Sequence, residues 1–391
     1  MARINPEILV WARETAGFSL EEGARVLLIK AERLEEMERG EKEPTRKQLL
    51  KMEKKYRRSL LTFYLDKVPH AGNRGQDFRT VPGRKRPVYN ATVDALIRDI
   101  NVRQGLVRSL LEDQESLPLP FIDSANIKQS PRSVANSIRD VLRLNTAEFQ
   151  KQNTVEAAFK YLRTQIEEAG IFVLLIGNLG SYHTAISSEV FRGFVISDSI
   201  APFIVINDQD SHVSWSFTAL HEVTHLWLGV SGISDASMET GIETFCNNVA
   251  AQILLPDDEI RILEHVGGSG VPFDEAKQTI SDFALGRKVS GSMVAYRLFR
   301  KKIISAKVWE ELKSSFQQDW KSSEAKRKRK KKQSKSKGGP NYYVVRRDRL
   351  GKALLDLVDR SLEDNEITYT KAGKVLGVKP GNVIPLLRDV Y

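Results

Sequence analysis

The sequence predicts a mainly helical chain with one small β-sheet, an α+β fold built from several domains. Apolar residues recur at helical spacing through most of its length, and three short apolar runs near the middle are typical of strands. Stretches rich in turn formers or charge divide the chain between these segments. The length of 391 residues and the hydrophobic content of 41% are sufficient for at least one sizeable core.

Residues 1–66 are predicted to form a set of short helices separated by turn residues. Ser19 and Glu22 have the spacing of a capping box, which marks the start of the second helix. Gly40 and Pro44 close the third helix before a fourth begins. The order of helix, tight turn and helix indicates a helix-turn-helix domain.

This segment resembles the XRE-type, lambda-repressor-like family. The matching residues are Arg13-Glu14, Gly17, Ser19, Glu38 with Gly40, and Pro44-Thr45. In that family, short polar or basic side chains early on the third helix meet base edges, whereas this chain offers Ala31, Glu32, Glu35 and Glu36. Phosphates repel carboxylates, and only cytosine offers a carboxylate a good donor in the major groove. Specific DNA binding and a retained docking role both stay open for this domain.

Residues 67–124 are predicted to be a connector that contains one helix, over 91–113. The next domain is expected over 125–320. It contains amphipathic helices over 132–144 and 154–170, followed by strands over 171–177, 191–198 and 202–208.

The run KRKRKKKQSKSK, residues 326–337, holds nine Lys or Arg and no acid, so it accounts for nearly all of the net charge of +10. Such a run repels itself and is expected to stay unfolded, as a solvated basic linker over 321–340. The alternative is a tail that grips nucleic acid by neutralising phosphates. After the linker, residues 341–391 are expected to form a small C-terminal helical module, with a second helix-turn-helix pattern around 368–387.

The protein is expected to be cytoplasmic, with no membrane partner. No apolar run approaches the roughly 18 residues that cross a bilayer, and the N-terminus lacks a secretory signal. The single cysteine, Cys246, can form neither an intramolecular disulfide nor a cluster of thiolates. Any metal site is therefore expected to use His, Asp and Glu.

The segment TALHEVTHLWLG, residues 218–229, carries the chemistry. Two of only six histidines, His221 and His225, stand four residues apart in it, so on a helix both imidazoles can reach one Zn²⁺. Glu222 is set off from that face by about 100° of helix rotation, which suits a general base for a metal-bound water. The other histidines, His70, His183, His212 and His265, have no such partners and are expected to be satisfied or solvent-facing.

A hydrolytic zinc site normally takes three protein ligands. Downstream, in the helix predicted for SMETGIETFCNNVAAQILLP, Glu239 and Glu243 stand one turn apart. From the residues alone, either glutamate can supply the third ligand.

The segment resembles the ImmA/IrrE metallo-endopeptidases, on IVIN at 204–207, FTALHEVTH at 217–225, ETFCNNVAAQILLP at 243–256 and, more weakly, Ser290 and Arg297 in KVSGSMVAYRLFRK. The resemblance implies Glu243 as the third zinc ligand and Asn247 as a residue that orients a ligand. Cys246 and Val249 stand where the family has alanine and phenylalanine.

The resemblance implies an intracellular zinc-dependent endopeptidase that cleaves a specific protein, such as a transcriptional repressor or antitoxin of a phage, mobile-element or stress-response system. Glu222 is its expected general base, and Tyr182, His183 and Arg297 are candidates to stabilise the oxyanion. Two His and a carboxylate also suit Mn²⁺ or Fe²⁺. The alternative is a DNA-binding regulator or toxin-antitoxin component whose zinc domain docks or senses, but docking has no use for a general base.

Overall fold

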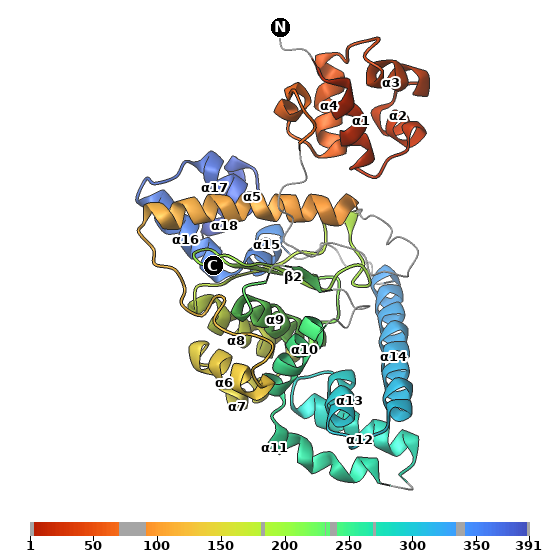
Figure 1. Ribbon diagram of the computed structural model, residues 1–391, viewed down its shortest axis with the longest axis vertical. Helices are drawn as coiled ribbons and strands as arrows, with labels where there is room; N and C mark the ends of the chain where they lie inside the picture. The colour runs from red at the N-terminus through yellow and green to blue at the C-terminus, as the bar shows by residue number, and fades with distance from the viewer. Residues whose placement is uncertain are drawn as a thin grey trace. The chain divides into compact units, whose positions relative to one another are not determined.

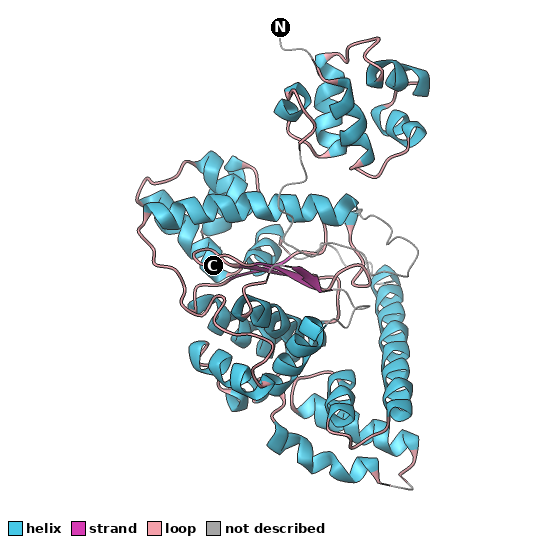
Figure 2. Ribbon diagram, in the orientation of Figure 1, coloured by secondary structure: helices cyan, strands magenta, loops and turns pink. Residues whose placement is uncertain are grey.

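The computed structural model describes residues 4–69, 91–180, 184–230, 232–234, 241–268, 271–333 and 341–388. Helices dominate these residues, and the described strands form one small sheet (Figure 2), so the predicted α+β class is confirmed. The chain divides into two compact units, residues 1–101 with 178–186 and residues 102–177 with 187–391. In the described part of the chain, no helix combines the length and hydropathy needed to span a membrane.

The first unit begins with helices α1 (Pro6–Glu14), α2 (Leu20–Leu27), α3 (Ala31–Glu38) and α4 (Arg46–Tyr56) and the 3-10 helix η1 (Leu60–Tyr64). The predicted capping box is confirmed, because the Ser19 hydroxyl accepts from Glu22 N and the Glu22 carboxylate accepts from Ser19 N. Only three residues separate α2 from α3, and the first of them, Leu28, takes the left-handed conformation that ends α2. Leu34 and Met52 lie in the shared core of these helices.

Helix α5 (Ala91–Asp113) covers the residues predicted for the connector helix. Its C-terminal part, from Val102, belongs to the second unit. There Arg108 forms ion pairs with Glu112 on α5 and with Asp198 beyond the helix.

The second unit contains the sheet and the helices that precede and follow its strands. These elements are α6 (Pro131–Val141), α7 (Thr146–Gln150), α8 (Val155–Glu168), β1 (Phe172–Leu175), β2 (Gly193–Ile196), β3 (Phe203–Ile206), α9 (His212–Trp227), β4 (Gly232–Ser234) and α10 (Gly241–Leu254). The strand order is β1-β3-β2-β4, with β1 parallel to β3 and the other two pairs antiparallel. The three predicted strands are present, and β4 is an addition too short for alternation to reveal.

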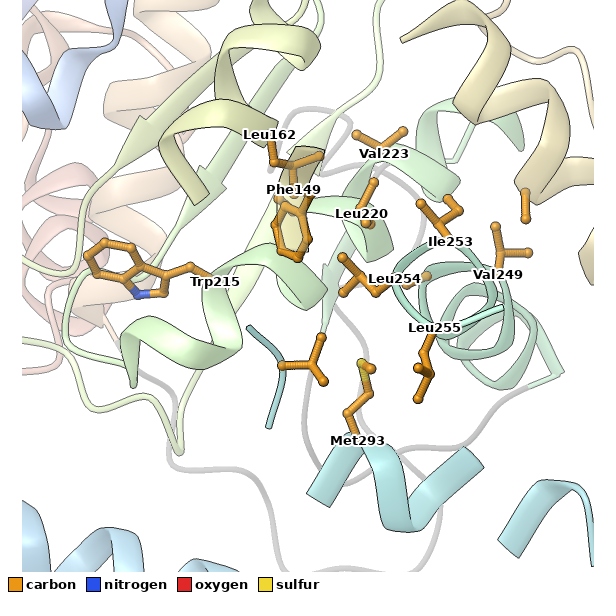
Figure 3. Close-up of a cluster of buried hydrophobic side chains, with 14 of the residues drawn as sticks. Phe149, Leu162, Trp215, Leu220, Val223, Val249, Ile253, Leu254, Leu255 and Met293 are labelled. Atoms are coloured by element: carbon orange, nitrogen blue, oxygen red, sulfur yellow. The ribbon is translucent and has the colours of Figure 1, made fainter. Parts of the chain in front are cut away.

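Helices α8 and α9 pack on the sheet, and α10 packs along α9 (Figure 1). The core between α9 and α10 is formed by side chains such as Leu220, Val223, Val249 and Ile253, which lie together in Figure 3. All four are completely buried. This apolar contact fixes the two helices that carry the candidate site residues.

The unit continues with α11 (Asp257–Ile260), the 3-10 helix η3 (Arg261–Gly267), α12 (Phe273–Gly286), α13 (Gly291–Arg300) and α14 (Ala306–Gln333). Helix α14 takes in residues 326–333 of the basic run, so the expectation that this run stays unfolded is wrong for those residues. Lys and Arg are good helix formers, the helix is already nucleated where α14 packs on α13, and positive charge is favourable at a helix C-terminus.

The C-terminal elements are α15 (Tyr342–Leu350), α16 (Lys352–Glu363), α17 (Tyr369–Leu376), the 3-10 helix η4 (Pro380–Asn382) and α18 (Val383–Leu387). They pack on the sheet unit, with α15 against β1 and α16 against α8. Glu167 of α8 accepts hydrogen bonds from Lys352 N at 3.0 Å and Ala353 N at 3.2 Å, so its carboxylate caps α16. Arg163, one turn earlier on α8, donates to the carbonyl of Asp348.

Candidate metal centre

Helix α9 carries His221, Glu222 and His225 inside the protein. The three side chains are 4%, 0% and 3% exposed, so three polar groups occupy an apolar interior. The helix ends where Gly229 takes a left-handed φ of 64°, a conformation that glycine adopts without strain. Burial of ionisable groups is costly unless they are paired or bind an ion, so this segment requires partners.

Those partners come from α10. Glu243 Oε2 lies 3.1 Å from His221 Nε2, and Glu243 Oε1 lies 3.3 Å from His225 Nε2. The two imidazole Nε2 atoms are themselves 3.1 Å apart. The three predicted ligand side chains thus point their donor atoms at one place, whereas Glu239 lies outside the described residues.

A hydrogen bond to the Nδ1 side of the His221 ring fixes its orientation. Its Nδ1 lies 3.0 Å from Asn247 Oδ1, one helical turn beyond Glu243 on α10. An amide oxygen at that distance accepts a hydrogen bond from Nδ1–H and leaves the Nε2 lone pair on the side of Glu243. The contact expected for Asn247 is therefore present, with the tautomer assigned from the hydrogen-bond pattern.

Glu222 lies against strand β2, and a glycine makes room for it. A methyl group placed on the Cα of Gly193 would lie 2.9 Å from Glu222 Oε1 and 2.7 Å from Thr218 Cγ2. Any larger residue at this position would push the carboxylate or the helix away. This role of Gly193 was not predicted, although a glycine inside a predicted strand signals close approach of another group.

The electrostatics of the cluster favour a cation. Burial acts to raise the pKa of Glu243, but hydrogen bonds and charges from His221 and His225 outweigh it and lower the pKa to about 2. Burial likewise acts to lower the pKa of His225, but contacts with the Cys246 thiol and the Glu243 carboxylate raise it well above its ordinary value. A divalent ion bound by these imidazoles would therefore compete with protons for the same nitrogen atoms.

Cys246 adds a further donor. The ligand atoms of His221, His225 and Cys246 all lie within 4.8 Å of one another, and the cysteine is completely buried. The expectation that a metal site here uses only His, Asp and Glu was therefore too narrow. One thiol cannot build a cluster of thiolates, but it can join two imidazoles. Glu243 is the better-placed third ligand, because its oxygens are 3.1 and 3.3 Å from the two Nε2 atoms.

The donor set fits a divalent transition metal. Two imidazole nitrogens with one carboxylate match the ligand types of catalytic zinc sites, and Mn²⁺ or Fe²⁺ accept the same donors. The Glu243 side chain is 18% exposed, so this ligand of the cluster is in part accessible to solvent.

The remaining candidates lie elsewhere. Arg297 of α13 donates to Gln252 Oε1 at 2.6 Å and to Asp257 Oδ1 at 2.5 Å, at the far end of α10 from Glu243. Because Gln252 lies nine positions after Glu243, the helix separates these contacts from the centre by roughly 13 Å. Arg297 is therefore not placed beside the cluster, and Tyr182, His183 and His70 lie outside the described residues.

The two other described histidines have local partners. His212 Nδ1 lies 2.7 Å from Glu156 Oε1, and its ring packs on Trp215. His265 Nδ1 lies 3.0 Å from the carbonyl oxygen of Ile262. Both are satisfied, as expected.

Comparison with known proteins supports the interpretation of this cluster as a candidate metal centre. Residues 167–281 match the Peptidase_M78 family model, described as the IrrE N-terminal-like domain. The match covers less than a third of the chain but includes α9, α10, Gly193 and every member of the cluster. No curated protein and no solved structure matches the chain. The matched segment is thus similar to a peptidase family, and it coincides with the buried cluster.

Proposed function

We propose that this chain is a zinc-dependent endopeptidase. The convergence of His221 Nε2, His225 Nε2 and the Glu243 carboxylate within 3.3 Å of one another carries the proposal. The peptidase family match over the same residues supports it independently. Zn²⁺ bound by these residues would activate a water near neutral pH and polarise a peptide carbonyl.

Glu222 is the proposed general base. It is adjacent in sequence to His221 but points from a different side of α9, toward β2, so it is available for proton transfer and not needed as a ligand. Its carboxylate accepts a proton from the attacking water and delivers that proton to the leaving amine nitrogen. Asn247 holds His221 in the orientation that leaves Nε2 free.

The proposed substrate is a specific protein, such as a transcriptional repressor or antitoxin. This part of the proposal rests on the resemblance to the ImmA/IrrE enzymes. The N-terminal helices are proposed as a docking module, because α3 presents acidic residues where a DNA reader needs basic or neutral ones. The same observation argues against the DNA-binding regulator as the main function.

Metal analysis combined with a cleavage assay tests the proposal. Purified protein is expected to carry about one divalent ion per chain and to cleave a repressor-like protein encoded beside its own gene. Glu222→Gln should retain the ion and reduce cleavage by about 10²–10⁴-fold, because the amide keeps the shape but cannot accept a proton. Cleavage by Glu222→Gln at the wild-type rate would overturn the assignment of the base, and protein with no metal and no cleavage would overturn the function.

A further inference from the structure

The buried thiol of Cys246 is not used by the proposed mechanism. We propose that Cys246 is an alternative third protein ligand of the metal centre, and that it makes the centre select thiophilic divalent ions over hard ones. The inference rests on the proposed metal site. It goes beyond that site by assigning the centre a second mode of coordination.

Geometry places the thiol in the cluster. Cys246 lies three residues after Glu243 on α10, so both side chains project from the same face toward α9. Its sulfur lies within 4.8 Å of the ligand atoms of His221 and His225. A tetrahedral ion with ordinary Zn–S and Zn–N bonds requires sulfur and nitrogen roughly 3.6 Å apart. A shift of about an ångström or less would thus bring the thiol to ligand distance.

Glu243 and Cys246, the two candidates for the third ligand, differ in the metal ions that they prefer. The carboxylate of Glu243 is a hard donor that accepts Mn²⁺, Fe²⁺ and Zn²⁺ alike, whereas a thiolate favours Zn²⁺, Co²⁺ and Cd²⁺. A coordinated thiol binds as the thiolate, so its proton leaves to solvent when the ion enters. With Cys246 in reach, the centre should retain thiophilic ions even when Glu243 is removed.

Cobalt substitution tests this without a peptide substrate. Full-length protein loaded with Co²⁺ alone should show thiolate-to-cobalt charge-transfer absorption in the near ultraviolet, and Glu243→Gln should show it more strongly. Cys246→Ala should abolish the band in both backgrounds while the Glu243-containing protein still binds about one Co²⁺. Alanine is a suitable replacement because it fits the same buried space without a donor atom.

Ion selectivity provides a second measurement. The ratio of Cd²⁺ to Mn²⁺ affinity should fall by about tenfold or more in Cys246→Ala, because only thiophilic ions lose a ligand. Bound Co²⁺ with no charge-transfer band in either wild type or Glu243→Gln would overturn the inference and leave the proposed function standing. Protein that binds no divalent ion, or a His225→Ala variant that binds one normally, would overturn the proposed centre itself and this inference with it.

Discussion

Two buried polar clusters, one in each compact unit, use ionisable residues in opposite ways. In the N-terminal helices, Arg13 Nε donates to Glu38 Oε1 at 2.8 Å and Arg13 Nη2 donates to Glu38 Oε2 at 2.9 Å. The third nitrogen, Nη1, donates to the carbonyl of Phe18 at 2.9 Å. Every one of these donors faces an acceptor, so the charge of Arg13 is balanced by Glu38 and the pair needs no bound ion or ligand.

In the candidate metal centre, acceptors face one another. His221 Nε2 lies 3.1 Å from both His225 Nε2 and Glu243 Oε2, and His225 Nε2 lies 3.3 Å from Glu243 Oε1. More lone pairs than protons meet there, and an added proton or metal ion makes that arrangement favourable. A buried polar cluster with complementary partners therefore indicates a structural role, whereas one with surplus acceptors indicates a ligand. Arg13 and Glu38 belong to the helix-turn-helix resemblance, yet their contacts are structural.

The largest expected effect separates the two clusters directly. His225→Ala should remove the bound ion, because it deletes an imidazole that coordination through Glu243 and coordination through Cys246 both require, while changing the stability of the N-terminal helices little. Arg13→Ala should leave the metal content unchanged but destabilise those helices by about 3–5 kcal/mol, because it leaves the Glu38 carboxylate buried and unpaired. Metal analysis and chemical denaturation measure the two effects.

Wild-type metal content in His225→Ala would contradict the assignment of the second cluster as a metal centre. Loss of metal in Arg13→Ala, with its stability unchanged, would contradict the purely structural role of the Arg13–Glu38 pair. His221→Ala serves as a replicate of the first arm, because its Nε2 contacts the same carboxylate.

A smaller effect is expected from the glycine beside the general base. Gly193→Ala should retain the metal ion but lower the cleavage rate by about 10²-fold, because the new methyl group displaces Glu222 from its position. The matched control is Gly286→Ala at the end of α12, where an added Cβ meets no atom within 4 Å. Equal cleavage rates in the two variants would show that the Gly193 contact does not position the base.

The relative placement of the candidate site residues could be predicted better than the tertiary contacts around them. The spacing of His221 and His225 fixes their relative positions because both lie on one helix, and local geometry is set by the helix itself. The helix over 91–113 was predicted for the same reason, since its apolar period and turn-rich flanks are both local. Strand β4, by contrast, exists through its pairing with β2, a contact that no local pattern encodes.

Tertiary context also explains the other omissions. The folding of residues 326–333 follows from the helix that begins upstream at Ala306, and charge counting alone does not include that continuation. The closeness of Cys246 to the two histidines depends on how α10 packs along α9. The sequence showed a cysteine in place of alanine but not the distance to its neighbours.

The contribution of Asn247 should be smaller again. Asn247→Ala should weaken metal binding by about 10–100-fold, the range found when the partner of a ligating histidine is removed. Competition titration with a chromophoric chelator measures this change. Asn248→Ala is the neighbouring control, because its side chain accepts from the Tyr296 hydroxyl instead. If both variants lose affinity equally, the loss comes from α10 as a whole and not from the orientation of His221.

The smallest effects are expected on α3, where a third group of ionisable side chains lies at the surface and is not buried like the other two. Glu36 pairs with Lys42 at 2.6 Å and with Arg33 at 3.4 Å, and all three side chains are at least 32% exposed. Exposed pairs contribute little, so Glu36→Ala should change the unfolding free energy by no more than about 1 kcal/mol.

The same acidic face should give no operator recognition. DNA binding by the full-length chain is expected to be weak, independent of sequence and strongly reduced by salt, because the basic run supplies it by neutralising phosphates. The full chain is required, since a cut at residue 320 would sever α14 and remove the helices that pack on α8 and β1. A mobility-shift titration against the DNA flanking its own gene measures the preference, with Glu36→Ala as the comparison. A tight site that survives competitor DNA would contradict the docking role and show that the N-terminal helices recognise a DNA sequence. The carboxylates of α3 would then have to contact cytosine donors and not a protein surface.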